Sequence, residues 1–76
     1  MTPQRDLLTI RFKNMTPSPM TVVLEPWAEE SVLPAGASCD IIEQGGATHD
    51  LIEIHVEPSR TTFFAREASI MKLRML

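Results

Sequence analysis

Residues 49–57, with the sequence HDLIEIHVE, contain the residue types that could do chemistry. If this stretch is a β-strand, alternate residues share a face, so His49, Glu53 and His55 lie on the same side. Imidazole and carboxylate groups are ligands for zinc, iron and manganese. Same-face neighbours on a strand are roughly 6.5 to 7 Å apart, close enough to share an ion. One hypothesis is therefore a minimal divalent-metal site at these three residues.

The opposite face of the same stretch is apolar, because Ile52, Ile54 and Val56 alternate with the polar residues. A strand with one polar and one apolar face is the ordinary case in an antiparallel sheet. Its polar face then meets water, or arginine and lysine on a neighbouring strand. The polar face of residues 49–57 thus has two interpretations, a metal site or a solvated surface.

No motif for a particular reaction is present elsewhere in the sequence. Glu29 and Glu30 are adjacent, so on a strand they point to opposite faces and make a poor acid–base pair. Cys39 has Asp40 beside it and no basic neighbour that would lower its pKa. Neither a nucleophile elbow nor a phosphate-binding loop occurs. We therefore expect a non-enzymatic protein without a resident cofactor, a divalent metal ion being the one exception left open.

Length and cysteine usage place the chain in a broad class. A chain of 76 residues predicts a single domain over 1–76 with a thin core. Its one cysteine cannot form a disulfide within the chain, which fits a reducing compartment. The first twelve residues lack the uninterrupted apolar run of a signal peptide, and no stretch approaches membrane-spanning length. We expect a cytoplasmic protein that does not enter a membrane.

Charge is distributed unevenly along the chain. Residues 14–59 contain eight carboxylates and no lysine or arginine, whereas the two ends hold all seven basic residues. An acidic middle argues against nucleic-acid binding, which needs clustered cations. Basic end strands lying beside acidic central strands would explain the pattern by pairing across the sheet. Two oppositely charged faces that attract copies of the protein are the alternative.

Prolines and alternating apolar residues divide the chain into about seven short strands. This pattern predicts an all-β fold, a small antiparallel sandwich or a partly open barrel. A C-terminal helix is the alternative for the last segment, because its Met, Lys, Leu and Arg residues are good helix formers. The predicted strands are residues 7–13, 20–25, 29–33, 38–44, 50–57, 61–65 and 68–75.

Two of the turns predict which strands pair. Pro34 and Gly36 predict a type I turn followed by a glycine bulge, so that 38–44 pairs back on 29–33. Arg66 and Glu67 are expected to be a two-residue hairpin turn between the last two strands.

Residues 24–27 (LEPW), followed by acidic residues and by 33–36 (LPAG), resemble a pattern in small uncharacterised bacterial β domains. The likeness covers roughly residues 20–45, and its Leu-Pro-x-Gly turn is also common in cupin-like proteins. The resemblance implies a small β fold and carries no activity. Metal-binding cupins use a His-x-His pair, whereas this chain has Glu53-x-His55 there and no third histidine.

Apolar residues on both faces of several strands favour association. A thin sandwich buries only the inner face of each sheet, so the outer set needs loops or another subunit to cover it. We therefore expect a protein-interaction or assembly module, most simply a homo-oligomer or a binder of another protein. A third hypothesis is a small ligand held between the sheets with Trp27 as a wall. The predicted contact residues are Val23, Trp27, Phe64, Met71 and Met75.

Overall fold

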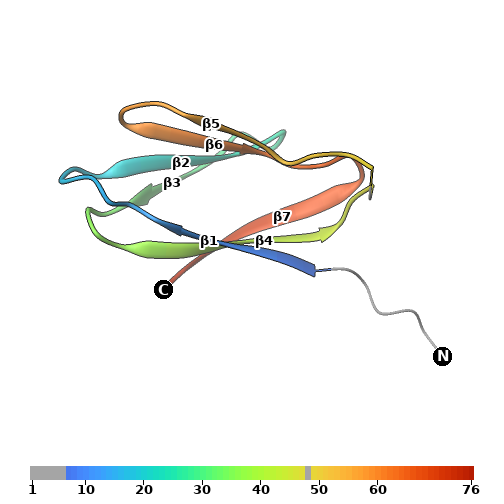
Figure 1. Ribbon diagram of the computed structural model, residues 1–76, viewed down its shortest axis with the longest axis horizontal. Helices are drawn as coiled ribbons and strands as arrows, with labels where there is room; N and C mark the ends of the chain where they lie inside the picture. The colour runs from blue at the N-terminus through green and yellow to red at the C-terminus, as the bar shows by residue number, and fades with distance from the viewer. Residues whose placement is uncertain (1–6, 48) are drawn as a thin grey trace.

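The computed structural model describes residues 7–47 and 49–76, which form two β-sheets packed face to face (Figure 1). One sheet has three strands in the order β1-β4-β7, and the other has four in the order β3-β2-β6-β5. The strands are β1 (Leu7–Lys13), β2 (Met20–Glu25), β3 (Glu29–Leu33), β4 (Ser38–Gly45), β5 (Glu53–Val56), β6 (Arg60–Phe64) and β7 (Ser69–Met75).

The predicted all-β sandwich is confirmed, with two corrections. The C-terminal segment is the predicted strand, β7, and the described residues contain neither a helix nor a closed barrel. The four-stranded sheet is mixed, because β2 and β6 run parallel. The strand predicted over 50–57 is shorter, since β5 begins at Glu53 and the chain before it turns.

Both pairing predictions made from turn residues are wrong. β3 and β4 belong to different sheets, and so do β6 and β7. The turn at 34–37 does exist, closed by the amide of Ala37 donating to the carbonyl of Pro34 at 3.0 Å. Gly36, with φ of 76°, occupies its third position, as a type II turn requires. The turn therefore carries the chain from one sheet to the other and does not form a hairpin.

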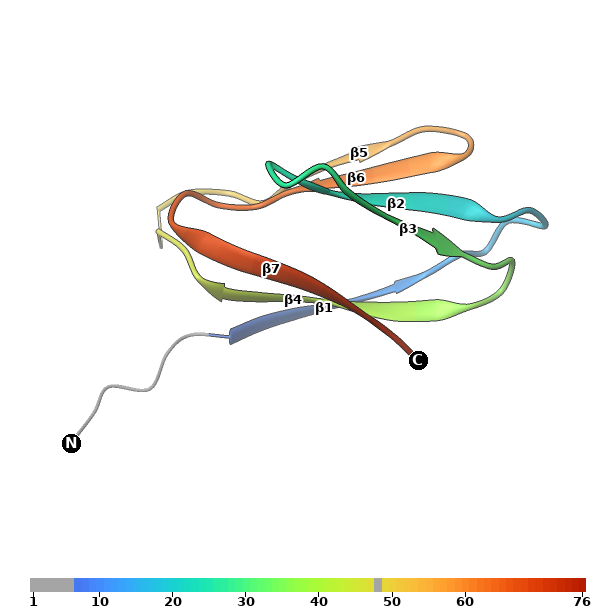
Figure 2. The same ribbon diagram turned by 180° about the vertical axis from the view of Figure 1, so that it is seen from behind.

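The chain passes between the sheets four times, twice at each end of the sandwich. The β1–β2 and β3–β4 connections lie at one end, and the β4–β5 and β6–β7 connections lie at the other (Figures 1 and 2). The odd-numbered strands consequently run one way and the even-numbered strands the other. Such a path explains why β2 and β6 are parallel although they are neighbours.

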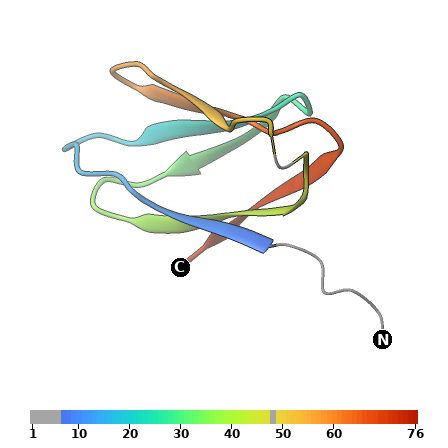
Figure 3. The ribbon, with the colours of Figure 1, turned by 45° about the vertical axis from the view of Figure 1, so that its right-hand side comes forward.

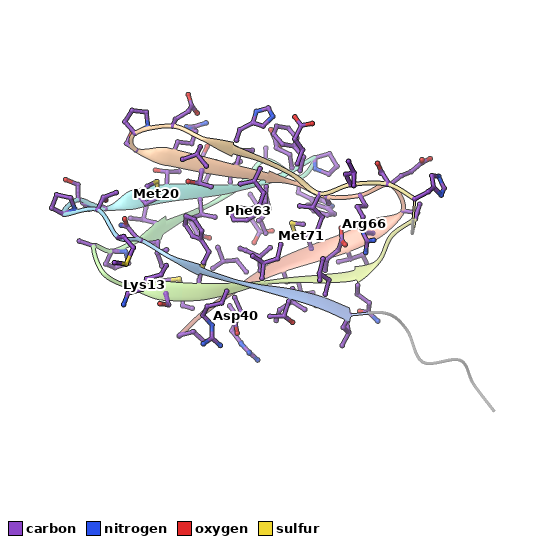
Figure 4. The ribbon with its side chains drawn as sticks, viewed as in Figure 1. Lys13, Met20, Asp40, Phe63, Arg66 and Met71 are labelled. Carbon is purple, nitrogen blue, oxygen red and sulfur yellow. The ribbon has the colours of Figure 1, made fainter. Side chains whose placement is uncertain are left out.

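The core lies between the two sheets and draws side chains from both. Phe12 on β1 meets Phe63 on β6 edge to face, with ring centroids 5.5 Å apart. Figure 4 shows Met20, Phe63 and Met71 pointing into this space. The buried cluster consists of Met20, Val22, Leu24, Leu33, Cys39, Ile41, Phe63 and Met71.

Asn14 ties together the two connections at the first end. Its side chain is buried, and the Nδ2 group donates to the carbonyls of Ser18, Leu33 and Pro34 at 2.8 to 3.2 Å. Its Oδ1 atom accepts from the amide and the hydroxyl of Thr16. Because every polar atom of the amide has a partner, burying Asn14 fixes the loop geometry without an unsatisfied group.

Glu43 and Arg66 form the corresponding clamp at the other end. The carboxylate of Glu43 faces the interior and is 1% exposed, and it accepts from Nε of Arg66 at 2.7 Å. The amide of Arg66 donates to the same carboxylate at 3.0 Å, and its guanidinium also donates to the carbonyl of Gly45. The end of β4 is thus joined to the β6–β7 connection.

Two opposing effects set the pKa of Glu43. Burial would raise the pKa, but hydrogen bonds from the amide and side chain of Arg66 outweigh burial, so the pKa lies below the ordinary value. A depressed folded-state pKa stabilises the fold above the unfolded-state pKa of about 4.3. This stabilisation is lost as the pH falls from about 4.3 through the lower pKa of the folded state.

Glu43→Gln is expected to lower the free energy of unfolding at neutral pH by about 3 kcal/mol, because it leaves the guanidinium of Arg66 without its counter-charge. The variant should also lose less stability than the wild type between neutral and acidic pH. Urea denaturation at several pH values measures both effects. Glu30→Gln, at an exposed carboxylate on β3, is the matched control and should change neither. Equal stability of Glu43→Gln and wild type would contradict the clamp.

Candidate interaction surface

The predicted metal ligands do not come together. Glu53 and His55 lie on the outer face of β5, where the two side chains are paired and the His55 ring packs on Phe64 with centroids 4.6 Å apart. His49 lies in the turn before β5, off that face, because the strand begins later than predicted. Among residues 7–47 and 49–76, no three His, Cys, Asp or Glu side chains are placed to share an ion. The prediction that these three residues together hold one metal ion is therefore wrong.

The predicted contact residues do not form one surface. Val23 and Met71 are only 4% and 3% exposed, so their prediction as surface contacts is wrong. Met71 points into the core, and Val23 lies on the central strand β2, flanked by β3 and β6. Trp27 is exposed in the β2–β3 hairpin, whereas Met75 is exposed at the end of β7, in the other sheet. Phe64 is half-buried beside His55.

A shallow hollow of about 410 Å³ lies next to the β2–β3 hairpin. Its walls are Glu25, Pro26, Phe64 and Ala65, and Trp27 is not among them. The hollow opens on the surface and does not lie in the core between the sheets. This hollow is therefore not the ligand site walled by Trp27 that the sequence suggests, and that hypothesis stays a prediction.

Cys39 is fully buried in the core. Burial raises the pKa of its thiol, and the nearby charge of Asp40 raises it further. A protonated thiol without access to solvent is a poor nucleophile. The raised pKa agrees with the lack of a basic neighbour beside Cys39 in the sequence.

Charge pairing across the three-stranded sheet is confirmed. Asp40 on the central strand β4 lies opposite Arg11 on β1 and Arg74 on β7. Its carboxylate accepts from Arg11 at 2.6 and 3.2 Å and from Arg74 at 3.0 Å. The hydrogen bond from Arg11 is the main reason that the pKa of Asp40 lies below its usual range. Figure 4 shows Asp40 on the outer side of this sheet.

The outer faces of the two sheets nevertheless carry opposite charge. On the three-stranded sheet, the strand register places four cations against one carboxylate, namely Arg11, Lys13, Lys72 and Arg74 against Asp40. On the four-stranded sheet, it places three carboxylates against one cation, namely Glu25, Glu30 and Glu53 against Arg60. Cross-strand pairing and oppositely charged faces, the two interpretations of the sequence, therefore coexist.

The side of the sandwich between β1 and β5 is incompletely covered, and we call it the open side. Ile54 and Val56 belong to the inner face of β5 by the strand alternation, yet they are 45% and 74% exposed. Leu8, on the inner face of β1, is 41% exposed. At the opposite side, Leu33 on the edge strand β3 is completely buried, and of the described inner-face apolar residues there only Met75, at the end of β7, has comparable exposure. Because Phe12 on the edge strand β1 packs against Phe63 on β6, the three-stranded sheet leaves much of β5 uncovered.

No family model matches this chain, and neither a curated protein nor a solved structure matches it. The resemblance carried by residues 24–36 accordingly stays a prediction. Within the part of the chain that the structure describes, no helix has the length and apolarity to cross a bilayer. The open side exposes apolar residues that a sandwich normally buries.

Cys39 should react with a thiol reagent only after unfolding, because its side chain is inaccessible and its pKa is raised. Labelling with a chromogenic disulfide reagent along a urea titration should follow the unfolding transition. Ser38→Cys, at a half-buried position next to it, supplies the matched accessible thiol and should label faster in the folded protein. Rapid labelling of wild-type Cys39 in the absence of urea would contradict the core arrangement.

Proposed function

We propose that the protein is a non-enzymatic assembly module that associates with copies of itself through the open side. The observation that carries the proposal is the exposure of Ile54 and Val56 on the inner face of a strand. Inner-face apolar residues of a sandwich are the ones that normally form the core. When they are exposed, the apolar surface they contribute is free to be buried by another chain.

The edges of the open side support binding by strand addition. Among the described strands, β1 is hydrogen-bonded to β4 alone, and β5 to β6 alone. Each therefore has a free edge whose backbone N–H and C=O groups can pair with a further strand. A strand that binds at the open side could therefore gain both main-chain hydrogen bonds and apolar burial.

The size of the protein makes association favourable. A domain of this length buries only about 60% of the surface that its unfolded chain exposes. Covering Ile54 and Val56 in a complex adds apolar burial of roughly 25 cal/mol per Å². A small domain therefore gains proportionately more stability from such burial than a large domain does.

Val56→Ser should weaken self-association at least about tenfold, because it removes apolar burial worth more than 1.4 kcal/mol from the contact. Light scattering after size exclusion over a range of concentrations measures the effect, with circular dichroism to verify folding. Val32→Ser is the matched control, since Val32 is 63% exposed on β3 at the opposite edge of the same sheet. A wild-type protein that stays monomeric at millimolar concentration would overturn the proposal.

A further inference from the structure

The two sheets differ by one strand, and the difference falls at the open side. Neighbouring strands lie about 4.8 Å apart, so a four-stranded sheet extends roughly one strand further than a three-stranded sheet. Because Leu33 at the β3 edge is buried whereas Ile54 and Val56 are exposed, the excess lies at the β5 edge. The vacant place is therefore beside the free edge of β1 and beneath β5. Figure 3 shows β1 at the front of the lower layer and the β5–β6 hairpin in the upper layer.

The chemistry of the vacant place specifies its occupant. An incoming strand must present apolar side chains inward, to meet Ile54 and Val56 from below. Its outward side chains would lie beside Arg11 and Lys13 on the outer face of β1, which favours carboxylates. The occupant is thus an edge strand with one apolar and one acidic face.

β5 of a second copy meets this description. Ile54 and Val56 form its apolar face, and Glu53 and His55 lie on the other face, followed by Glu57 directly after the strand. The strand is also at an edge and therefore available. A reciprocal arrangement follows, because the copy that supplies β5 has the same vacant place to be filled.

Resting on the proposed self-association, we infer that two copies interlock so that β5 of each lies beside β1 of the other. The two-fold axis runs parallel to the strands, so it exchanges the layers and joins the three-stranded sheet of one copy to the four-stranded sheet of the other. β1 and β5 run in the same direction within one chain, so the new pairing is parallel (Figure 1). Ile54 and Val56 of one copy then face the same residues of the other. This contact is closed and self-complementary, as most dimer contacts are.

The geometry disfavours the other two-fold arrangement. An axis perpendicular to the sheets would bring β5 against β5 and β1 against β1. The two projecting β5 strands would then meet first and hold the β1 strands apart. Ile54 and Val56 would remain uncovered beneath them. Only exchange of the layers lets each projecting strand fill the space left by the shorter sheet.

Disulfide cross-linking of mixed variants, each with one added cysteine, tests this arrangement. Thr9→Cys on the outer face of β1 is mixed in turn with Glu53→Cys, His55→Cys and Glu57→Cys, under oxidised glutathione. At least one mixture should give cross-linked dimers, because adjacent strands bring Cα atoms within the 4.4 to 6.8 Å that a disulfide needs. Each variant alone should give none, because the axis places its two copies in opposite layers. Wild type, with Cys39 buried, is the background control.

The outcomes separate this inference from the proposed function. Cross-linking of Thr9→Cys with itself would show β1 beside β1, and cross-linking of His55→Cys with itself would show β5 beside β5; either overturns the interlocked dimer. A dimer by light scattering without any mixed cross-link also overturns it while leaving self-association intact. A monomer at every concentration removes both proposals.

Discussion

The unequal number of strands in the two sheets is the constraint on which the rest of the structure depends. The chain passes between the layers four times, which places three strands in one sheet and four in the other. The connections between the layers are short, so they determine the sheet to which each strand belongs. Asn14 holds the connections at one end, and the pair of Glu43 and Arg66 holds those at the other. Because these buried polar groups have satisfied partners, they fix the path of the chain. The uncovered inner face of β5 is a direct consequence of that path.

Charged side chains stabilise this arrangement within one chain, and they also favour one orientation of a second copy. Asp40 lies between Arg11 and Arg74, which removes the repulsion that two arginines on one face would otherwise exert. The remaining charges leave one sheet face basic and the other acidic. Because the inferred dimer places the acidic face of β5 beside the basic face of β1, the same separation of charge favours strand addition there and disfavours pairing of like edges.

Local pattern predicted the strands well, because alternation and proline act within a few residues; β2 and β3 begin and end where the sequence indicates. Sheet membership could not be predicted, since the turn around Gly36 looks the same whether the chain doubles back or changes layers. The Glu43–Arg66 clamp was missed because its partners are 23 residues apart. Alternation showed that Ile54 and Val56 share a face. Their exposure depends on how many strands the opposite sheet contains, which no local pattern reveals.

Amide hydrogen exchange at increasing protein concentration tests the central claim most directly, because it reports where association occurs. Amides of β1 and β5 at their free edges are expected to exchange more slowly in concentrated than in dilute protein. Edge amides of β3 and β7, on the opposite side of the sandwich, should exchange equally fast at both concentrations. Protection that grows at β3 and β7, or that does not change with concentration anywhere, would contradict association through the open side.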